Sequence, residues 1–146
     1  MAFCYAGSVP PVDEPQPPAY ARSLGGRRIL VVDDHPDTLD MLGQACEAHG
    51  ATVLSATSAR AALAIAQADR PEVVITDIGL RGEDGLWLLR ELRRLPVAIP
   101  VIALTGRSPE DALAAGFDAV MLKPADPWQV CEELQRLLGT RSPRSA

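Results

Sequence analysis

The chain alternates between short apolar runs and amphipathic stretches. The apolar runs show little polar alternation and are rich in Val, Ile and Leu, which predicts buried strands. These runs are residues 27–33, 51–56, 72–77, 99–105 and 118–123. The stretches between them carry apolar residues three or four positions apart, which predicts helices with one buried face. These stretches are residues 36–50, 58–70, 84–95, 108–116 and 127–138.

Local signals mark several of the helix ends. Ser58 is a suitable N-cap for the second helix. Ser108 followed by Pro109 suits a cap and a first helical position. Gly50 is a suitable stop for the first helix. These signals support five strand–helix units in succession.

Five such units predict an α/β fold. Strands that are apolar on both faces need helices on both sides of a parallel sheet. Right-handed crossovers then give an open, doubly wound sheet. We predict a flavodoxin-like (βα)5 sandwich with a five-stranded parallel sheet of order 2-1-3-4-5. Ligands of such sheets bind beyond the carboxyl ends of the strands, at the point where the strand order reverses.

The two ends of the chain differ in composition from its middle. Residues 1–26 are rich in proline and are predicted to be a disordered leader. Residues 27–138 form one domain, and residues 139–146 are predicted to be a disordered tail. A length of 146 residues suits one domain and not two.

Charge and cysteine content narrow the class of protein. The net charge of −5 argues against a nucleic-acid binder. The three cysteines, Cys4, Cys46 and Cys131, lie far apart, which indicates a reducing compartment and no zinc site. Cys46 and Cys131 are expected to be small core residues. The sequence has no convincing signal peptide and no apolar run long enough to span a membrane, so we expect a cytoplasmic protein.

Polar residues follow four of the five predicted strands. Asp33 and Asp34 follow the first strand, and Asp77, Thr105 and Lys123 end the third, fourth and fifth strands. Each residue alone has an ordinary explanation as a cap, a turn residue or a solvated side chain. Together at one edge of a parallel sheet they predict a shallow polar cleft.

Three converging carboxylates repel one another unless a cation lies between them. Mg²⁺ favours one or two carboxylates together with waters and a phosphate oxygen. A carboxylate in such a cleft can act as a nucleophile toward phosphorus. The Thr105 hydroxyl and the Lys123 ammonium could then bind the phosphoryl oxygens.

The chain resembles the receiver domain of bacterial two-component response regulators over residues 27–138. The resemblance rests on "ILVVDDHPD", "VVITDIGLRGEDGLWLLRELR", "IPVIALTG" and "AGFDAVMLKP". It implies that Asp77 is the phosphoacceptor and that Asp33, Asp34 and Asp77 hold Mg²⁺. The backbone carbonyl of Gly79 is implied as a further metal ligand.

The resemblance also implies roles for the remaining site residues and for partners. Thr105 would respond to the phosphoryl group, Lys123 would pair with Asp77 or its phosphate, and the peptide bond before Pro124 would be cis. The phosphodonor would be a phosphohistidine on a sensor histidine kinase or a histidine phosphotransfer domain. Signalling would proceed through protein–protein contacts, and a homodimer is compatible with the sequence.

Three positions depart from the family pattern. Val120 stands where receivers usually carry an aromatic switch residue, Arg81 where proline is common, and Ala125 where phenylalanine is common. The segment between Thr105 and Lys123 is also short, which predicts an abbreviated fourth helix. We therefore expect any output to use another face, such as the first helix.

Other classes fit less well. A phosphohydrolase with an aspartate nucleophile needs a second aspartate where Gly79 stands, so no enzyme activity is predicted. A flavodoxin needs a phosphate-binding loop where the acidic "DDHPD" stands. A receiver-fold scaffold or phosphate sink without a phosphorylation-driven switch remains the alternative. We expect a stand-alone receiver rather than the end of a hybrid kinase. His35 is interpreted as a loop residue that could tune metal access.

Overall fold

The computed structural model describes residues 23–106 and 108–139. Five strands and five helices alternate along this part of the chain: β1 (Arg28–Val32), α1 (Pro36–Ala48), β2 (Thr52–Ala56), α2 (Ala59–Asp69), β3 (Val73–Asp77), α3 (Gly85–Arg93), β4 (Val101–Thr105), α4 (Pro109–Ala115), β5 (Ala119–Leu122) and α5 (Pro127–Leu138). Among these helices none is both long enough and apolar enough to cross a bilayer. The predicted strand–helix alternation is confirmed.

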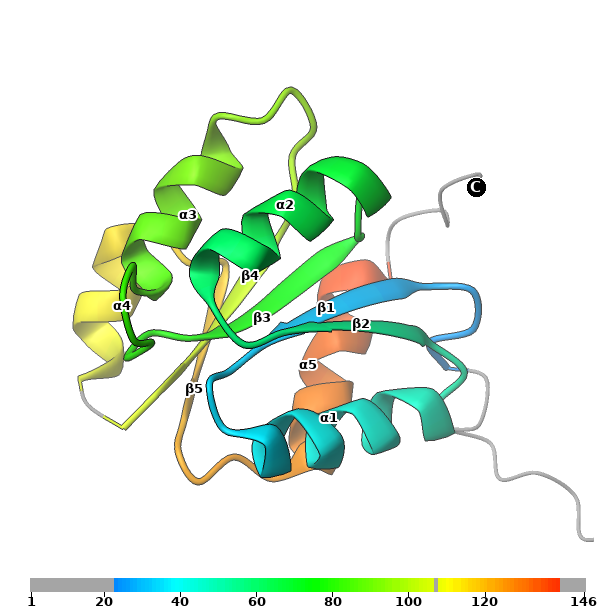
Figure 1. Ribbon diagram of the computed structural model, residues 1–146. Coiled ribbons are helices and arrows are strands. Elements are labelled where there is room, and N and C mark those ends of the chain that lie inside the picture. Colours follow the sequence, from blue (N-terminus) through cyan, green and yellow to red (C-terminus); the bar gives the residue numbers. More distant parts are fainter. Residues whose placement is uncertain (1–22, 107, 140–146) are drawn as a thin grey trace, which may run out of the picture.

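The five strands form one parallel sheet in the order β2-β1-β3-β4-β5 (Figure 1). The predicted order is therefore confirmed. Val32 pairs with Thr76 and Asp77 pairs with Leu104, so β1, β3 and β4 finish at the same edge of the sheet. The order reverses between β1 and β3, which places a crevice beyond their carboxyl ends.

Helices cover both faces of the sheet (Figure 1). α2, α3 and α4 pack on one face against residues such as Leu30 and Val74. α1 and α5 pack on the other face against Val31 and Ile75. Adjacent strand residues point to opposite faces, so an uninterrupted apolar run fills two cores at once.

The helix ends follow the sequence signals with one exception. The Ser58 hydroxyl accepts a hydrogen bond from Ala61 N at 3.1 Å, as a capping residue does. Ser108 occupies the N-cap position of α4, but its hydroxyl donates to Glu110 instead of accepting from the helix backbone. The predicted Ser108 cap is therefore correct in position and wrong in bonding. Gly50 adopts a positive φ of 95° just beyond α1, as its predicted stop requires.

The packed structure begins before the predicted boundary at Arg27. Leu24 is 1% exposed and its N–H donates to the His49 carbonyl at 2.8 Å. Leu24, which lies within the predicted leader, thus buries its side chain in the core formed with α1 and α5. The rest of the leader and the predicted tail after Gly139 lie outside the described residues.

Candidate functional site

The carboxyl edge of the sheet brings the predicted polar residues together. Asp33 and Asp34 follow β1, and Asp77 is the last residue of β3. Thr105 ends β4, and Lys123 directly follows β5. Asp33, Asp77 and Thr105 are buried, although their side chains are polar. Burying a polar group costs free energy unless the group is paired. The hydrogen-bond and ion-pair partners of these buried side chains therefore show how the site is built.

Lys123 connects the two acidic strand ends. Its ammonium donates to Asp77 Oδ2 at 2.8 Å and to Asp33 Oδ2 at 3.4 Å. Partial burial by itself would lower the pKa of this ammonium, but its bonds to the two carboxylates more than offset that effect and raise the pKa. Lys123 therefore stays charged at neutral pH and neutralises part of the acidic cluster.

Backbone contacts fix the position of Asp77. Its Oδ1 accepts a hydrogen bond from Gly79 N at 3.0 Å. Gly85, the first residue of α3, donates its N–H to the Ile78 carbonyl at 2.9 Å. A Cβ atom on Gly85 would lie 2.6 Å from the Asp77 carbonyl oxygen and 2.8 Å from Ile78 Cα. The start of α3 thus rests directly on the backbone that carries Asp77, and only glycine allows this approach.

Asp33 and Asp34 differ in their bonding. Asp33 Oδ1 accepts from the backbone N–H of His35 at 2.9 Å and also contacts the His35 ring at 3.0 Å. Asp34 Oδ2 lies 3.7 Å from the guanidinium of Arg81, whose side chain is 92% exposed. Asp34 Oδ1 is buried and, within the part of the chain that the structure describes, accepts no hydrogen bond. A buried carboxylate oxygen without a donor is costly, which indicates a place for a cation.

The donor atoms suit a divalent ion. One ligand atom each from Asp33, Asp34, His35 and Asp77 lies within 4.8 Å of all the others. Mg²⁺ and similar hard cations prefer carboxylate oxygens, and the unpaired Asp34 Oδ1 meets that preference. The residues present therefore fit the ion that the sequence analysis expects. Gly79 lies in the loop that follows β3, beside Asp77, and the role of its carbonyl stays a prediction.

A hollow of about 600 Å³ lies beside Asp77. Thr105 lines this hollow from β4, opposite the loop that contains Gly79 and Gly82. The Thr105 carbonyl accepts the Lys123 backbone N–H at 2.8 Å, which ties the ends of β4 and β5 together. The hollow gives room beside the Asp77 carboxylate for a group the size of a phosphoryl.

A model of the response regulator receiver domain matches residues 29–135. The chain belongs to the response regulator receiver family. This match covers the sheet except Arg28, the first residue of β1, and it covers four of the helices completely. Receiver domains are signalling domains rather than conventional enzymes.

Several relatives share this receiver domain. The chain is 36% identical to the "Uncharacterized 14.6 kDa protein in sodA1 3'region" of Leptolyngbya boryana, over 79% of this chain and 92% of that protein. It is 33% identical to the phosphate regulon transcriptional regulatory protein PhoB of Pseudomonas aeruginosa, over 81% of this chain but 54% of that protein. The chain thus spans about half the length of the transcriptional regulators that it matches.

Solved structures agree with this receiver fold. The chemotaxis response regulator CheY4 of Vibrio cholerae superposes with a TM-score of 0.72 at 30% identity, over 77% of this chain and 98% of that chain. A CheY-like receiver domain protein of Methanospirillum hungatei superposes with a TM-score of 0.72 at 32% identity, over 77% of this chain and 94% of that one. In both comparisons the superposition spans nearly the full length of the other chain.

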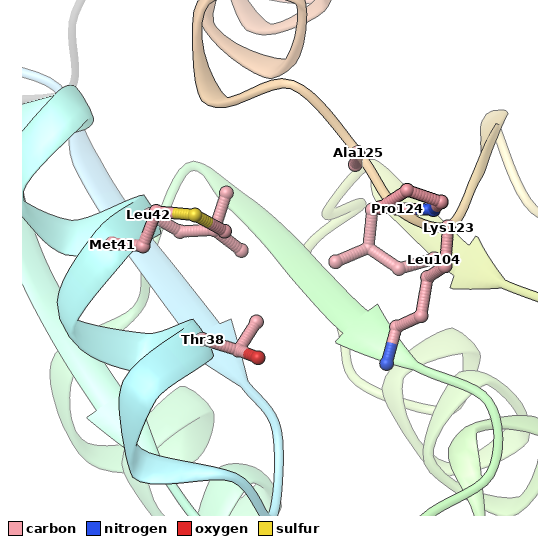
Figure 2. Close-up of a pocket in the computed structure, with 7 residues that line it drawn as sticks. All are labelled: Thr38, Met41, Leu42, Leu104, Lys123, Pro124 and Ala125. Carbon is pink, nitrogen blue, oxygen red and sulfur yellow. The ribbon is translucent and has the colours of Figure 1, made fainter.

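A largely apolar groove of about 430 Å³ lies beside the acidic cluster of the receiver domain. Figure 2 shows it between α1, which contributes Thr38 and Met41, and the segment from Lys123 to Ala125. The Lys123 side chain reaches out of this segment toward the end of β3 (Figure 2). The Lys123–Pro124 peptide bond is cis, as the family resemblance implies.

The structure shows where the residues that depart from the family pattern lie. Val120 is half-buried and packs on the α4 side of the sheet, against the core that contains Ala112. α4 has seven residues and is the shortest helix in the described part of the receiver, which confirms the expected abbreviation. Arg81 reaches back to Asp34 across the loop.

Sequence reasoning interpreted His35 as a loop residue that could tune metal access, but it did not predict that the ring contacts two carboxylates. The His35 ring lies against both Asp33 and Asp34. Its position directly after the acidic pair and before Pro36 was the only available signal. That signal does not determine the ring orientation, which depends on the tertiary fold.

Proposed function

We propose that this receiver accepts a phosphoryl group from a phosphohistidine onto Asp77 and signals through protein–protein contacts. The observation that carries the proposal is the Lys123 ammonium bound to Asp77 Oδ2 at 2.8 Å, beside a buried Asp34 oxygen that lacks a donor. This arrangement prepares a carboxylate for phosphorus chemistry and leaves a place for a cation.

The transfer forms one bond and breaks one. A carboxylate oxygen of Asp77 forms a bond to the donor phosphorus while the phosphorus–nitrogen bond to the donor histidine breaks. The bonding electrons stay on the histidine nitrogen, which takes a proton from solvent. Lys123 lies next to Asp77 and can pair with the oxygens of the transferred group, which carry negative charge throughout the transfer.

Asp33, Asp34 and Asp77 would hold the Mg²⁺ ion, with the Gly79 carbonyl as a further ligand. When bound, the ion supplies positive charge that offsets the repulsion between these carboxylates and the incoming phosphoryl group. The protein contributes the fixed geometry of this cluster, because β1 and β3 are neighbours in the sheet.

Thr105 and the apolar groove would link phosphorylation to partners. Thr105 lines the hollow beside Asp77, where its hydroxyl could bond to a phosphoryl oxygen. The groove between α1 and Pro124 borders Lys123, so a partner that docks there would approach the phosphoacceptor. A sensor histidine kinase or a histidine phosphotransfer domain is the partner class that we propose. Cys46 and Cys131, the cysteines among the described residues, are free and buried, which suits the reducing cytoplasm where we place the protein.

The alternative function is a phosphate sink or receiver-fold scaffold without a phosphorylation-driven switch. The observation that favours it is Val120, which provides no aromatic ring on the α4 side of β5. The short α4 points the same way, since it reduces the surface on that side. A sink would still accept phosphate on Asp77, so the two functions share their first step.

Intact-mass analysis after incubation with a small-molecule phosphodonor tests the proposal. We expect one added phosphoryl group that requires Mg²⁺ and is lost in Asp77→Asn. Asp37→Asn is the matched control, because Asp37 is an exposed aspartate in the first turn of α1 and should leave the adduct unchanged. An adduct that persists in Asp77→Asn would contradict the assignment of the phosphoacceptor. The absence of any adduct in wild type, with Mg²⁺ binding intact, would favour the scaffold.

A further inference from the structure

The His35 ring contacts two carboxylates of the acidic cluster. Its Nδ1 is 3.0 Å from Asp33 Oδ1 and 3.0 Å from Asp34 Oδ1. One ring nitrogen therefore faces the two carboxylates that follow β1. Asp77, the third carboxylate of the cluster, approaches from β3. Lys123, which is hydrogen-bonded to Asp77, approaches from the end of β5.

A hydrogen bond alone accounts poorly for this position. Nδ1 carries at most one proton, which cannot fully serve two carboxylate oxygens. Asp33 Oδ1 accepts the His35 backbone N–H at 2.9 Å and is also hydrogen-bonded to the ring at 3.0 Å, so the ring is its second partner. Asp34 Oδ1 lies 3.0 Å from the same nitrogen, yet it accepts no hydrogen bond within the described residues. The ring nitrogen therefore lies 3.0 Å from two carboxylate oxygens, of which only one is hydrogen-bonded to it.

The spacing of these three atoms suits ligands of one ion. Two adjacent ligands of a six-coordinate ion with bonds of about 2.1 Å lie about 3.0 Å apart. Both nitrogen–oxygen distances equal 3.0 Å. The fourth donor, from Asp77, lies within 4.8 Å of the other three, so all four donors come from one small region.

The local backbone holds the ring in this place. His35 is the N-cap of α1 with φ −104° and ψ 114°, an extended conformation that the following Pro36 favours. The side chain is 66% exposed, so the ring can adjust to an ion without disturbing the core. The local backbone therefore fixes where the His35 ring lies, while the ring itself stays accessible to solvent.

We propose that His35 Nδ1 is a further ligand of the divalent ion in this site. The proposal rests on the proposed function, because it uses the same metal site. Imidazole nitrogen adds little to the affinity for Mg²⁺ but favours first-row transition ions such as Mn²⁺ and Co²⁺. His35 thus makes the receiver responsive to a transition ion that the aspartates alone would bind less selectively.

Calorimetry tests this role. The metal-free protein is titrated with Mg²⁺ and with Co²⁺ at one fixed pH. His35→Asn keeps an N–H donor near the place of Nδ1 but has no nitrogen lone pair to offer a metal, and His35→Phe keeps a ring without nitrogen. We expect Co²⁺ affinity to fall about tenfold or more in both variants, while Mg²⁺ affinity changes less than about threefold.

Nuclear magnetic resonance of the Co²⁺-loaded protein gives a second readout. We expect strongly shifted signals from the His35 ring, which the variants lack. His49, the other histidine of the chain, is an internal control. It lies at the far end of α1, about 20 Å along the helix, and its ring is hydrogen-bonded to the Ala45 carbonyl. Its signals should stay near their metal-free positions.

The outcomes separate the two proposals. If both ions bind and the ratio of their affinities is the same in wild type and variants, His35 is not a ligand and the proposed function is unaffected. If the variants bind Co²⁺ more tightly, the ring obstructs the site, and the ligand role is equally overturned. If wild type binds neither ion, the Mg²⁺ site of the proposed function fails, and the role of His35 fails with it.

Discussion

Lys123 Nζ lies 2.8 Å from Asp77 Oδ2 and 3.4 Å from Asp33 Oδ2, so a single ammonium bridges the ends of three strands. β1, β3 and β5 contribute these groups, although β5 is the edge strand and pairs only with β4. The ammonium offsets one of the negative charges in the cluster. The oxygen that it does not reach, Asp34 Oδ1, is the buried acceptor without a donor.

Replacing Lys123 by methionine should destabilise the metal-free protein. The change leaves the Asp33 and Asp77 carboxylates without their cation, and we expect a loss of about 1–3 kcal/mol in the free energy of unfolding. Urea unfolding in the presence of a chelator measures this loss, and added Mg²⁺ should recover part of it. Arg136→Met is the control, because Arg136 is exposed and pairs with Glu133 on the same helix. Equal losses in both variants would show that the ammonium has no special role.

Asp34→Asn should make the metal-free protein more stable and less responsive to Mg²⁺. The substitution removes a buried charge whose Oδ1 accepts no bond among the described residues, so we expect a gain of about 1 kcal/mol without metal. An ion that binds only the folded state raises the melting temperature, and this rise should shrink in the variant. Thermal unfolding with and without Mg²⁺ gives both quantities. A full Mg²⁺ response in Asp34→Asn would exclude Asp34 as a metal ligand, and Asp37→Asn should respond like wild type.

Gly85→Ala should disturb the strand end that carries Asp77. The added Cβ would lie 2.6 Å from the Asp77 carbonyl oxygen, so backbone has to move, at a cost of about 1–3 kcal/mol. Gly43→Ala is a matched control, since a Cβ there meets only Val53 Cγ1 at 3.6 Å and alanine favours a helix by up to about 1 kcal/mol. Chemical denaturation distinguishes the two. Similar stability of both variants would show that α3 can withdraw from Asp77 without loss.

Val120→Tyr tests whether the usual switch position is used. Val120 is half-buried and packs on the α4 side of β5, against the core that contains Ala112. We expect the extent and lifetime of Asp77 phosphorylation to change less than about twofold. We also expect the variant to bind its partner as wild type does, both in the phosphorylated and in the unphosphorylated state. Stability should fall by about 1 kcal/mol, because tyrosine overfills a half-buried place. A time course of intact mass measures the lifetime, and a change of several fold would show that position 120 is coupled to the phosphoacceptor.

The sequence determined the fold class and most of the site. Uninterrupted apolar strands such as 72–77 require cover on both faces, and this pattern fixed the alternation of helices and the parallel sheet. Asp33, Asp77 and Lys123 stand directly at strand ends, so their convergence follows from strand order alone. Periodicity and position carry this information without any knowledge of side-chain orientation.

Only the tertiary structure decided which atoms meet. No sequence pattern distinguishes a loop histidine from one whose ring faces two carboxylates, because the orientation of His35 depends on how β1 leads into α1. Likewise, the inclusion of Leu24 in the core depends on a hydrogen bond to His49 that lies 25 positions along the chain. Contacts between groups distant in sequence require strands and helices to be packed first, and the local pattern does not encode their final distances.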